Sequence, residues 1–389
     1  MLQKFRENVH IMLLGAAHSL NHSLFVIAPP LLALIMSDLG ITKSVIGAVS
    51  TAASFIYGVG ALVGGPLGDK IGEAKTITLC LAFSGLSTLI MLAAGATRDI
   101  YIYGLALVLM AAWASLYHPT ANSLISKAFK GKVAESMGLH GVGGTLGVVL
   151  TPTIAWVIGA TFGWSWAFVI FGVSCVVLAL LFVRGFRQTD KRNSNGGTII
   201  DALKIRELWI LLIFNVAVGL FMKGVELYFP TYINENRQID SAWASVALTL
   251  VLAAGVPGQW IGGKAADKIG SKKVLIVTSV GVCLGFLSLL LVPIYLFGVA
   301  LFILLYGVSF YAHQPALNSL AGFLSPQNQR GAVYGIFFFT SFGIGSISQL
   351  IAGYVADIYG LDVAFYILTT FAVTALLLSF KLPKKRETD

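Results

Sequence analysis

Five of the six histidines lie inside long apolar runs, where titratable side chains are uncommon. His18 and His22 are one helical turn apart, with Asn21 between them. His118 and His313 occupy near-equivalent places in the two halves of the chain. An unperturbed imidazole titrates at about pH 6.5, which suits proton transfer, and a neutral ring can also donate a hydrogen bond to an anion. For any single ring, a hydrogen bond between helices is an equally good interpretation.

The same rings have a second interpretation, as metal ligands. His18 and His22 have the spacing of two ligands on one helix, and His118 could approach them in three dimensions. Apart from Glu226, the apolar runs offer no further cysteine or carboxylate cluster to complete a coordination shell. The sequence therefore favours a substrate cavity over a metal site, and it implies no cofactor. His140 lies close to the end of its run, and we interpret it as structural.

Two charged residues, Lys223 and Glu226, lie three positions apart within one apolar run. A charge near the centre of a bilayer costs about 2.5–3.5 kcal/mol on insertion scales, so such residues usually face a cavity or a partner. Their spacing places both on one face of a helix, where they can neutralise each other. In a functional interpretation, Lys223 attracts an anionic substrate and Glu226 exchanges protons or balances the lysine. In the structural alternative, the two residues form a permanent ion pair that orients the helix.

Hydrophobic residues make up 57% of the chain and charged residues 11%, against roughly 25% charged in an average soluble domain. Such a chain cannot cover its surface with polar groups, so its surroundings must be lipid. A length of 389 residues allows about twelve spans of about 20 residues with short loops. The first run lacks a small-residue cleavage site, and we expect a retained span rather than a removed leader. The expected spans cover approximately 9–36, 44–66, 76–96, 100–126, 136–160, 164–184, 208–233, 241–264, 273–293, 296–323, 331–356 and 361–381.

The long polar segment 185–207 falls at the middle of the chain, and we expect it to link two bundles, 1–184 and 208–389. Cytoplasmic loops of membrane proteins are enriched in lysine and arginine. Of the 26 such residues, 22 fall at the two ends and in the loops after even-numbered spans, and three on the opposite side. Both termini are therefore expected on the cytoplasmic side of a cell membrane. The same asymmetry explains the net charge of +9 without a nucleic-acid partner.

The two halves of the chain share an internal repeat. The loop 65–72 and the loop 263–270 both end in Asp-Lys-Ile-Gly, at an offset of 198 residues. Two further pairs align at offsets of 196 and 197 residues, 119–124 with 315–320 and 163–168 with 360–365. Repeats in the same orientation predict two parallel six-helix bundles related by an axis along the membrane normal.

The repeated loop resembles the signature loop of the major facilitator superfamily of secondary transporters, and the resemblance covers the whole chain. The residues that carry it are Gly65, Asp69, Lys70 and Gly72 after the second span, and Gly263, Asp267, Lys268 and Gly270 after the eighth. In that family the loop latches the two halves on the cytoplasmic side. The resemblance therefore implies a gating role for Asp69, Lys70, Gly72, Asp267, Lys268 and Gly270. It also implies the major facilitator fold, with twelve transmembrane helices in two pseudo-symmetric bundles.

Two shorter motifs resemble branches of this superfamily. Tyr117-His118-Pro119 is similar to the fosmidomycin-resistance branch, and 143–152 is similar to a glycine-rich antiporter motif. In the family, spans one, four, seven and ten line the cavity. The residues that we expect to bind substrate are His18, Asn21, His22, Tyr117, His118, Lys223, Tyr311, His313 and Gln314. The residues that we expect to couple protons are Glu226, His118 and His313.

The sequence contains no phosphate-binding GxxxxGK(S/T) loop and no hydrolase or dinucleotide fingerprint, so we expect a transporter and no enzyme activity. We predict a secondary active transporter that moves a small organic anion, carboxylate or phosphonate-like, by proton-coupled alternating access, as a symporter or an antiporter. The alternatives are a proton-coupled multidrug efflux pump and a non-transporting membrane receptor on the same fold. The expected partners are a small-molecule substrate, protons and the lipid bilayer, with the chain working as a monomer.

Overall fold

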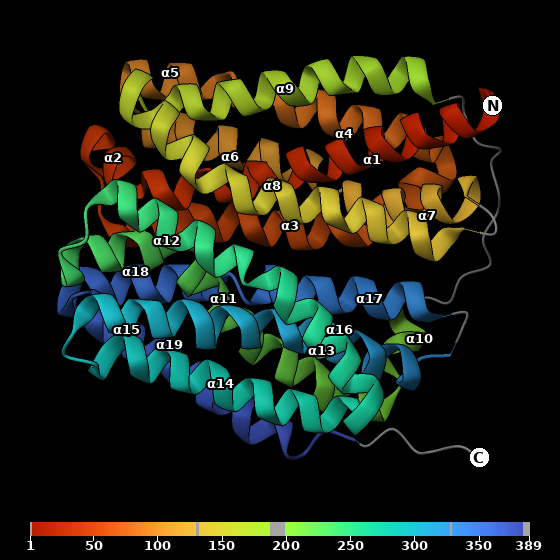
Figure 1. Ribbon diagram of the computed structural model, residues 1–389. Coiled ribbons are helices and arrows are strands. Elements are labelled where there is room, and N and C mark those ends of the chain that lie inside the picture. Colours follow the sequence, from red (N-terminus) through yellow and green to blue (C-terminus); the bar gives the residue numbers. More distant parts are fainter. Residues whose placement is uncertain (1, 130–131, 187–198, 327–328, 384–389) are drawn as a thin grey trace. The chain divides into compact units, whose positions relative to one another are not determined.

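The computed structural model in Figure 1 describes residues 2–129, 132–186, 199–326 and 329–383. Within these ranges the regular secondary structure is helical and no strand occurs. Twelve stretches of the described chain are long and apolar enough to cross a membrane. The predicted all-helical fold with twelve spans is therefore confirmed.

Large apolar side chains on the outside of the helices show which solvent surrounds them. Leu105, Leu146 and Leu180 in the first half are more than half exposed, as are Val277 and Leu377 in the second. Monomeric soluble proteins rarely expose apolar surface on this scale in contiguous patches. These side chains are placed to contact lipid.

The chain forms two compact units, one of Met1–Ile41 and Val49–Ser194 and the other of Thr42–Ala48 and Asn195–Asp389. The first turns of the helix that begins at Lys43 thus group with the second unit. There Asp357 accepts hydrogen bonds from the backbone N–H groups of Lys43 and Ser44, at 3.0 and 2.8 Å. The helices up to the middle of the chain are α1 (Leu2–Val26), α2 (Ala28–Leu39), α3 (Lys43–Ile71), α4 (Glu73–Thr88), α5 (Ile90–Thr97), α6 (Ile100–Ala114), α7 (Tyr117–Ala128), α8 (Val133–Phe162) and α9 (Trp164–Gly185).

The second half contains two π-helical segments, η1 and η3, inside its spans. Its helices are α10 (Ile199–Leu203), α11 (Arg206–Arg237), α12 (Ser241–Ala253), α13 (Gly255–Ile269), α14 (Ser271–Leu291), α15 (Tyr295–Phe302), η1 (Ile303–Gly307), α16 (Val308–Leu324), α17 (Arg330–Phe338), η3 (Phe339–Ile344), α18 (Ile347–Tyr359) and α19 (Leu361–Ser379). Within the expected linker 185–207, residues 187–198 lie outside the described part of the chain. The rest of that linker contains α10 and the start of α11.

A proline divides the span that carries His118. Pro119 has no N–H and its ring collides with the carbonyl four residues earlier, that of Ser115. Accordingly α6 ends at Ala114 and α7 begins at Tyr117. The span expected at 100–126 is thus two helices, and the break sets His118 in the first turn of α7.

The internal repeat is visible in the backbone. Gly72 and Gly270 separate consecutive helices with φ of 97° and 89°, and Gly163 and Gly360 do so with φ of 98° and 84°. These φ values lie in a region that side chains with a Cβ avoid. The two halves therefore use glycine at matching positions to turn from one span into the next.

In the first unit, α1 runs alongside α8 and α9, while α4 packs against α6 and α9 (Figure 1). The contact between α1 and α8 is backbone against backbone. A Cβ at Gly143 would lie 2.3 Å from the carbonyl oxygen of Gly15, and one at Gly147 would lie 2.1 Å from that of Ser19. Small residues at this spacing allow such an approach without polar contacts, and they bring α8 up to the histidines of α1.

The positive φ at Gly72, which the repeat shares with Gly270, can be tested by substitution. Gly72→Ala is expected to lower the free energy of unfolding by about 1–3 kcal/mol, because alanine must adopt a strained φ. Gly138 is the matched control, since it lies within α8 and a Cβ there meets no atom within 4 Å. Gly138→Ala is expected to leave stability unchanged or to raise it slightly. Thermal unfolding in detergent measures both, and an equal effect of the two substitutions would contradict the assignment.

Candidate functional site

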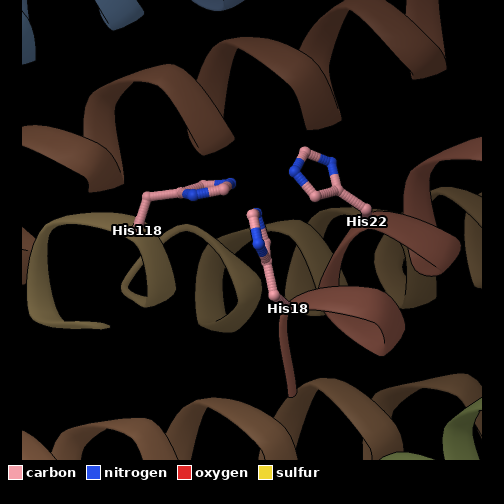
Figure 2. Close-up of side chains that lie close together, drawn as sticks. All are labelled: His18, His22 and His118. Carbon is pink, nitrogen blue, oxygen red and sulfur yellow. The ribbon is translucent and has the colours of Figure 1, made fainter. Parts of the chain in front are cut away.

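Three histidine side chains from α1 and α7 meet inside the first unit. Figure 2 shows the rings of His18, His22 and His118 turned toward one another. The ring centroids of His18 and His22 lie 4.7 Å apart, and that of His118 lies 5.1 Å from the first and 5.0 Å from the second. One ring nitrogen from each residue can be chosen so that all three lie within 4.8 Å of one another. The structure thus brings together three residues that the sequence predicted for one site.

A fourth histidine, which we interpreted as structural, orients the first. The ring of His140 on α8 stacks on that of His18 with centroids 4.0 Å apart. Its backbone carbonyl oxygen lies 2.8 Å from His18 Nδ1. A carbonyl can only accept, so His18 Nδ1 donates its hydrogen and a neutral ring carries a lone pair on Nε2. That Nε2 is buried with no hydrogen-bond partner among the described residues.

The local packing explains why His18 can sit there. A Cβ at Gly144 would lie 2.4 Å from His18 Cε1, so the imidazole occupies space that any larger residue on α8 would fill. Only glycine leaves room for the ring beside the tightly packed α1 and α8.

Tyr117 and Asn21 are close to the histidines but are engaged by the fold. The hydroxyl of Tyr117 donates to the carbonyl oxygen of Leu14 at 2.8 Å and lies 3.1 Å from His140 Nε2. The amide of Asn21 donates to the carbonyl oxygen of Ala114 at 2.9 Å, where α6 ends. Tyr117 is fully buried and Asn21 nearly so. Both side chains therefore brace α1 against its neighbours in this structure.

In the second unit, Lys223 and Glu226 form the ion pair that their spacing predicts. Lys223 Nζ lies 2.8 Å from Glu226 Oε2, and the two side chains are 3% and 21% exposed. The ammonium also lies 4.4 Å from the centroid of the Phe342 ring, a cation–π contact. Tyr311, also predicted to bind substrate, packs on α13, where a Cβ at Gly255 would lie 2.8 Å from its ring. The lysine is therefore buried with its charge balanced, and the glutamate is its more accessible half.

The remaining predicted residues lie on α16. His313 is buried, and its Nδ1 donates to the backbone carbonyl of Phe310. It borders a small pocket with Phe214, Phe221 and Thr278, so its surroundings are largely apolar. Gln314 Oε1 accepts a weak hydrogen bond from Gln259 at 3.4 Å. In the described parts of the chain the ring of His313 contacts that of Phe310, with centroids 5.1 Å apart, whereas His118 contacts two other histidines, although the two residues occupy near-equivalent positions in the repeat.

The predicted gating loop of the first unit is part of a charge cluster. Lys127 on α7 forms ion pairs with Asp69 at 3.4 Å and with Glu73. Ser123 donates to the same Glu73 carboxylate at 2.9 Å. The Glu73 side chain is only 2% exposed. Sequence reasoning missed Lys127 and Ser123; the signal that could have indicated a basic partner was Glu73, an acidic residue directly after the repeated loop.

The segments 65–71 and 263–269, which we expected to be loops, are instead the last turns of α3 and α13. Lys70 and Lys268 stand in the last turns of α3 and α13, and Gly72 and Gly270 follow those helices. Asp267 lies within α13. These positions are equivalent in the two units, as the repeat predicts.

The family model of the Major Facilitator Superfamily matches residues 11–349. This protein belongs to the major facilitator superfamily. It is accordingly a multi-pass membrane transporter with a small-molecule substrate, and not an enzyme.

This transporter is similar to several known proteins. It is 26% identical to the fosmidomycin resistance protein of Escherichia coli (strain K12), over 97% of this chain and 94% of the relative. It is 23% identical to the D-galactonate transporter of Escherichia coli O6:H1, over 88% and 87%. It is 25% identical to the probable sulfoacetate transporter SauU of Cupriavidus necator, over 61% and 59%.

Solved structures share the fold. A mutant of the nucleoside transporter NupG superposes with a TM-score of 0.82 at 15% identity, covering 96% of this chain and 99% of that one. A bacterial homologue of the human lysosomal transporter Spinster, inward-facing and unoccupied, has a TM-score of 0.77 at 16% identity, covering 97% of both chains.

The Lys127 cluster of this transporter provides a test. Lys127→Met is expected to lower the free energy of unfolding by about 1–3 kcal/mol, because it removes the ammonium that neutralises the buried Glu73 carboxylate. The double variant Lys127→Met/Glu73→Gln should recover most of that loss, since no buried charge is left uncompensated. Thermal unfolding in detergent measures all three proteins. A double variant no more stable than Lys127→Met alone would show that the pair does not act as a unit.

Proposed function

We propose that this secondary transporter moves a small organic anion together with a proton by alternating access. The observation that carries the proposal is the buried Lys223–Glu226 pair. An ammonium that is 3% exposed needs a negative partner, because an uncompensated charge in an apolar interior is expensive. Glu226 supplies that partner when no substrate is bound.

Coupling follows from charge balance. A proton that binds the Glu226 carboxylate neutralises it and leaves the Lys223 charge without its counter-ion. A substrate carboxylate, sulfonate or phosphonate can then take the place of the glutamate. One proton and one negative charge therefore enter together, and the net charge of the site stays constant. Glu226 is the accessible half of the pair, 21% exposed, as a group that exchanges protons should be.

The relatives support an anionic substrate. A transporter of D-galactonate and a probable transporter of sulfoacetate are both similar to this chain. Both named substrates are organic anions. The proton-transfer roles expected of His118 and His313, the gating role of the repeated loops, the cytoplasmic position of both termini and the monomeric state stay predictions.

Multidrug efflux is a second candidate, favoured by the likeness to a fosmidomycin resistance protein over nearly the whole chain. Under that alternative the Lys223–Glu226 pair orients α11 and does not exchange partners. A permanent ion pair can often be replaced by uncharged residues with little loss of stability. Removing both charges should therefore spare transport if the pair is structural and abolish it if the pair binds the anion.

The pair is tested by transport in proteoliposomes made with purified protein. Glu226→Gln imitates the protonated carboxyl and cannot release a proton. We expect it to keep the exchange of labelled anion across the membrane and to lose accumulation driven by a proton gradient, by tenfold or more. Accumulation at the wild-type level would contradict the coupling role of Glu226.

Lys223 is tested in the same assay with a paired substitution. Lys223→Met/Glu226→Gln removes both charges, leaves none uncompensated, and is expected to abolish anion exchange. Lys204→Met is the matched control, since it removes an exposed cation of the second unit that pairs with Asp201, and it should keep wild-type anion exchange. Near-normal anion exchange by the double variant would assign the pair a purely structural role.

A further inference from the structure

We propose that His18, His22 and His118 bind a first-row transition-metal dication of the Zn²⁺ type. This site goes beyond the anion and proton transport proposed above, which depends on residues of the other unit. The three imidazoles converge from two helices of the first unit (Figure 2). Three observations support the assignment. They are the distances between the ring nitrogens, the unpartnered Nε2 of His18 and the preference of imidazole for transition metals.

The geometry is close to that of a coordination shell. One nitrogen from each ring lies within 4.8 Å of the other two. Zn–N bonds of about 2.0–2.1 Å place two ligand nitrogens of a tetrahedral site about 3.4 Å apart. The rings therefore need to draw together by roughly an ångström. His22 and His118 are only partly buried, so rotation about their side-chain bonds can supply this movement.

The second observation concerns the unpartnered nitrogen of His18. This residue is 9% exposed, and its Nε2 is buried without a hydrogen-bond partner in the described parts of the chain. Its Nδ1–H donates to the His140 carbonyl oxygen at 2.8 Å, so Nε2 presents a lone pair. Metal-bound histidines almost always donate their other ring N–H in this way, which fixes the tautomer and the ring orientation. A neutral His18 therefore offers a carboxylate no donor at this nitrogen, but it offers a cation a ligand.

The donor set selects the ion. Imidazole suits zinc, copper and nickel, whereas magnesium and calcium prefer oxygen ligands. Three protein nitrogens leave a fourth position for water or an anion, the arrangement found at open zinc sites. The three ligands are neutral when they bind, so the dication keeps its charge and favours an anion at that position.

The first test measures metal binding by the full-length protein in detergent, after removal of any affinity tag. Titration calorimetry with Zn²⁺ and the visible absorption of Co²⁺ are the two readouts. We expect one ion per chain and a Co²⁺ spectrum of tetrahedral type. Failure to bind one equivalent, or a spectrum like that of hydrated Co²⁺, would overturn the proposal.

Substitutions locate the ion. His22→Gln and His118→Gln should each weaken Zn²⁺ binding by tenfold or more. His313→Gln is the matched control, because it also removes a histidine from a span but from the other unit, and it should bind as the wild type does. Equal affinity in His118→Gln and the wild type would place the ion elsewhere and overturn the assignment.

Two further variants test the role of His18 and separate metal binding from the proposed transport function. Gly144→Ala keeps every ligand but crowds the His18 ring, and it should also weaken binding. Lys223→Met/Glu226→Gln leaves the histidines untouched and should bind Zn²⁺ normally even if anion transport is lost. Normal binding by Gly144→Ala would contradict the role of His18, whereas transport defects alone would bear only on the proposed function.

Discussion

The constraint on which this structure depends is that a lipid interior offers no water to satisfy polar groups, so the protein must supply their partners. Most buried polar side chains obey it. The amide of Asn215 donates to the Phe337 carbonyl and to Thr340, and its oxygen accepts from Ser341, all at or beside the π-helical segment η3. The amide of Asn21 likewise donates to the carbonyl oxygen of Ala114 at the end of α6. Two groups depart from this pattern: His18 Nε2 is buried without a partner among the described residues, and Lys223 carries a charge into the interior. Groups of these two kinds are the candidates for binding ions or substrate.

The two units share a backbone plan but carry different chemistry. Glycines with positive φ turn the chain at matching places in both halves. The polar content has diverged, because the first unit holds the histidine cluster and the second holds the Lys223–Glu226 pair. Duplication thus accounts for the scaffold, whereas the residues proposed to bind ions and substrate differ between the two halves. The proposed exchange of partners at Lys223 needs no contribution from the histidines, which leaves those rings available for a different ligand.

Much of the fold was predictable, because low charge and long apolar runs leave few alternatives to membrane helices. The Asp-Lys-Ile-Gly repeat likewise marked the two positions where Gly72 and Gly270 turn the chain. Sequence spacing predicted the Lys223–Glu226 pair, since three residues along a helix put both on one face. It did not reveal the part played by His140, whose carbonyl reaches His18 across 122 residues. Nor did it distinguish His313 from His118, because the surroundings of each ring are set by tertiary packing. Lys127 escaped notice for the same reason, as its partners lie on α3 and α4.

The most direct measurement of the central claim, that a proton and an anion replace the Lys223–Glu226 contact together, is the charge moved per transport cycle. A monovalent organic anion is supplied to proteoliposomes while a potassium gradient with valinomycin sets the membrane potential. Charge balance at the pair predicts that a proton accompanies each anion, that no net current flows, and that the initial rate does not change with potential. A current carried by the anion, or a rate that follows the potential, would contradict the account.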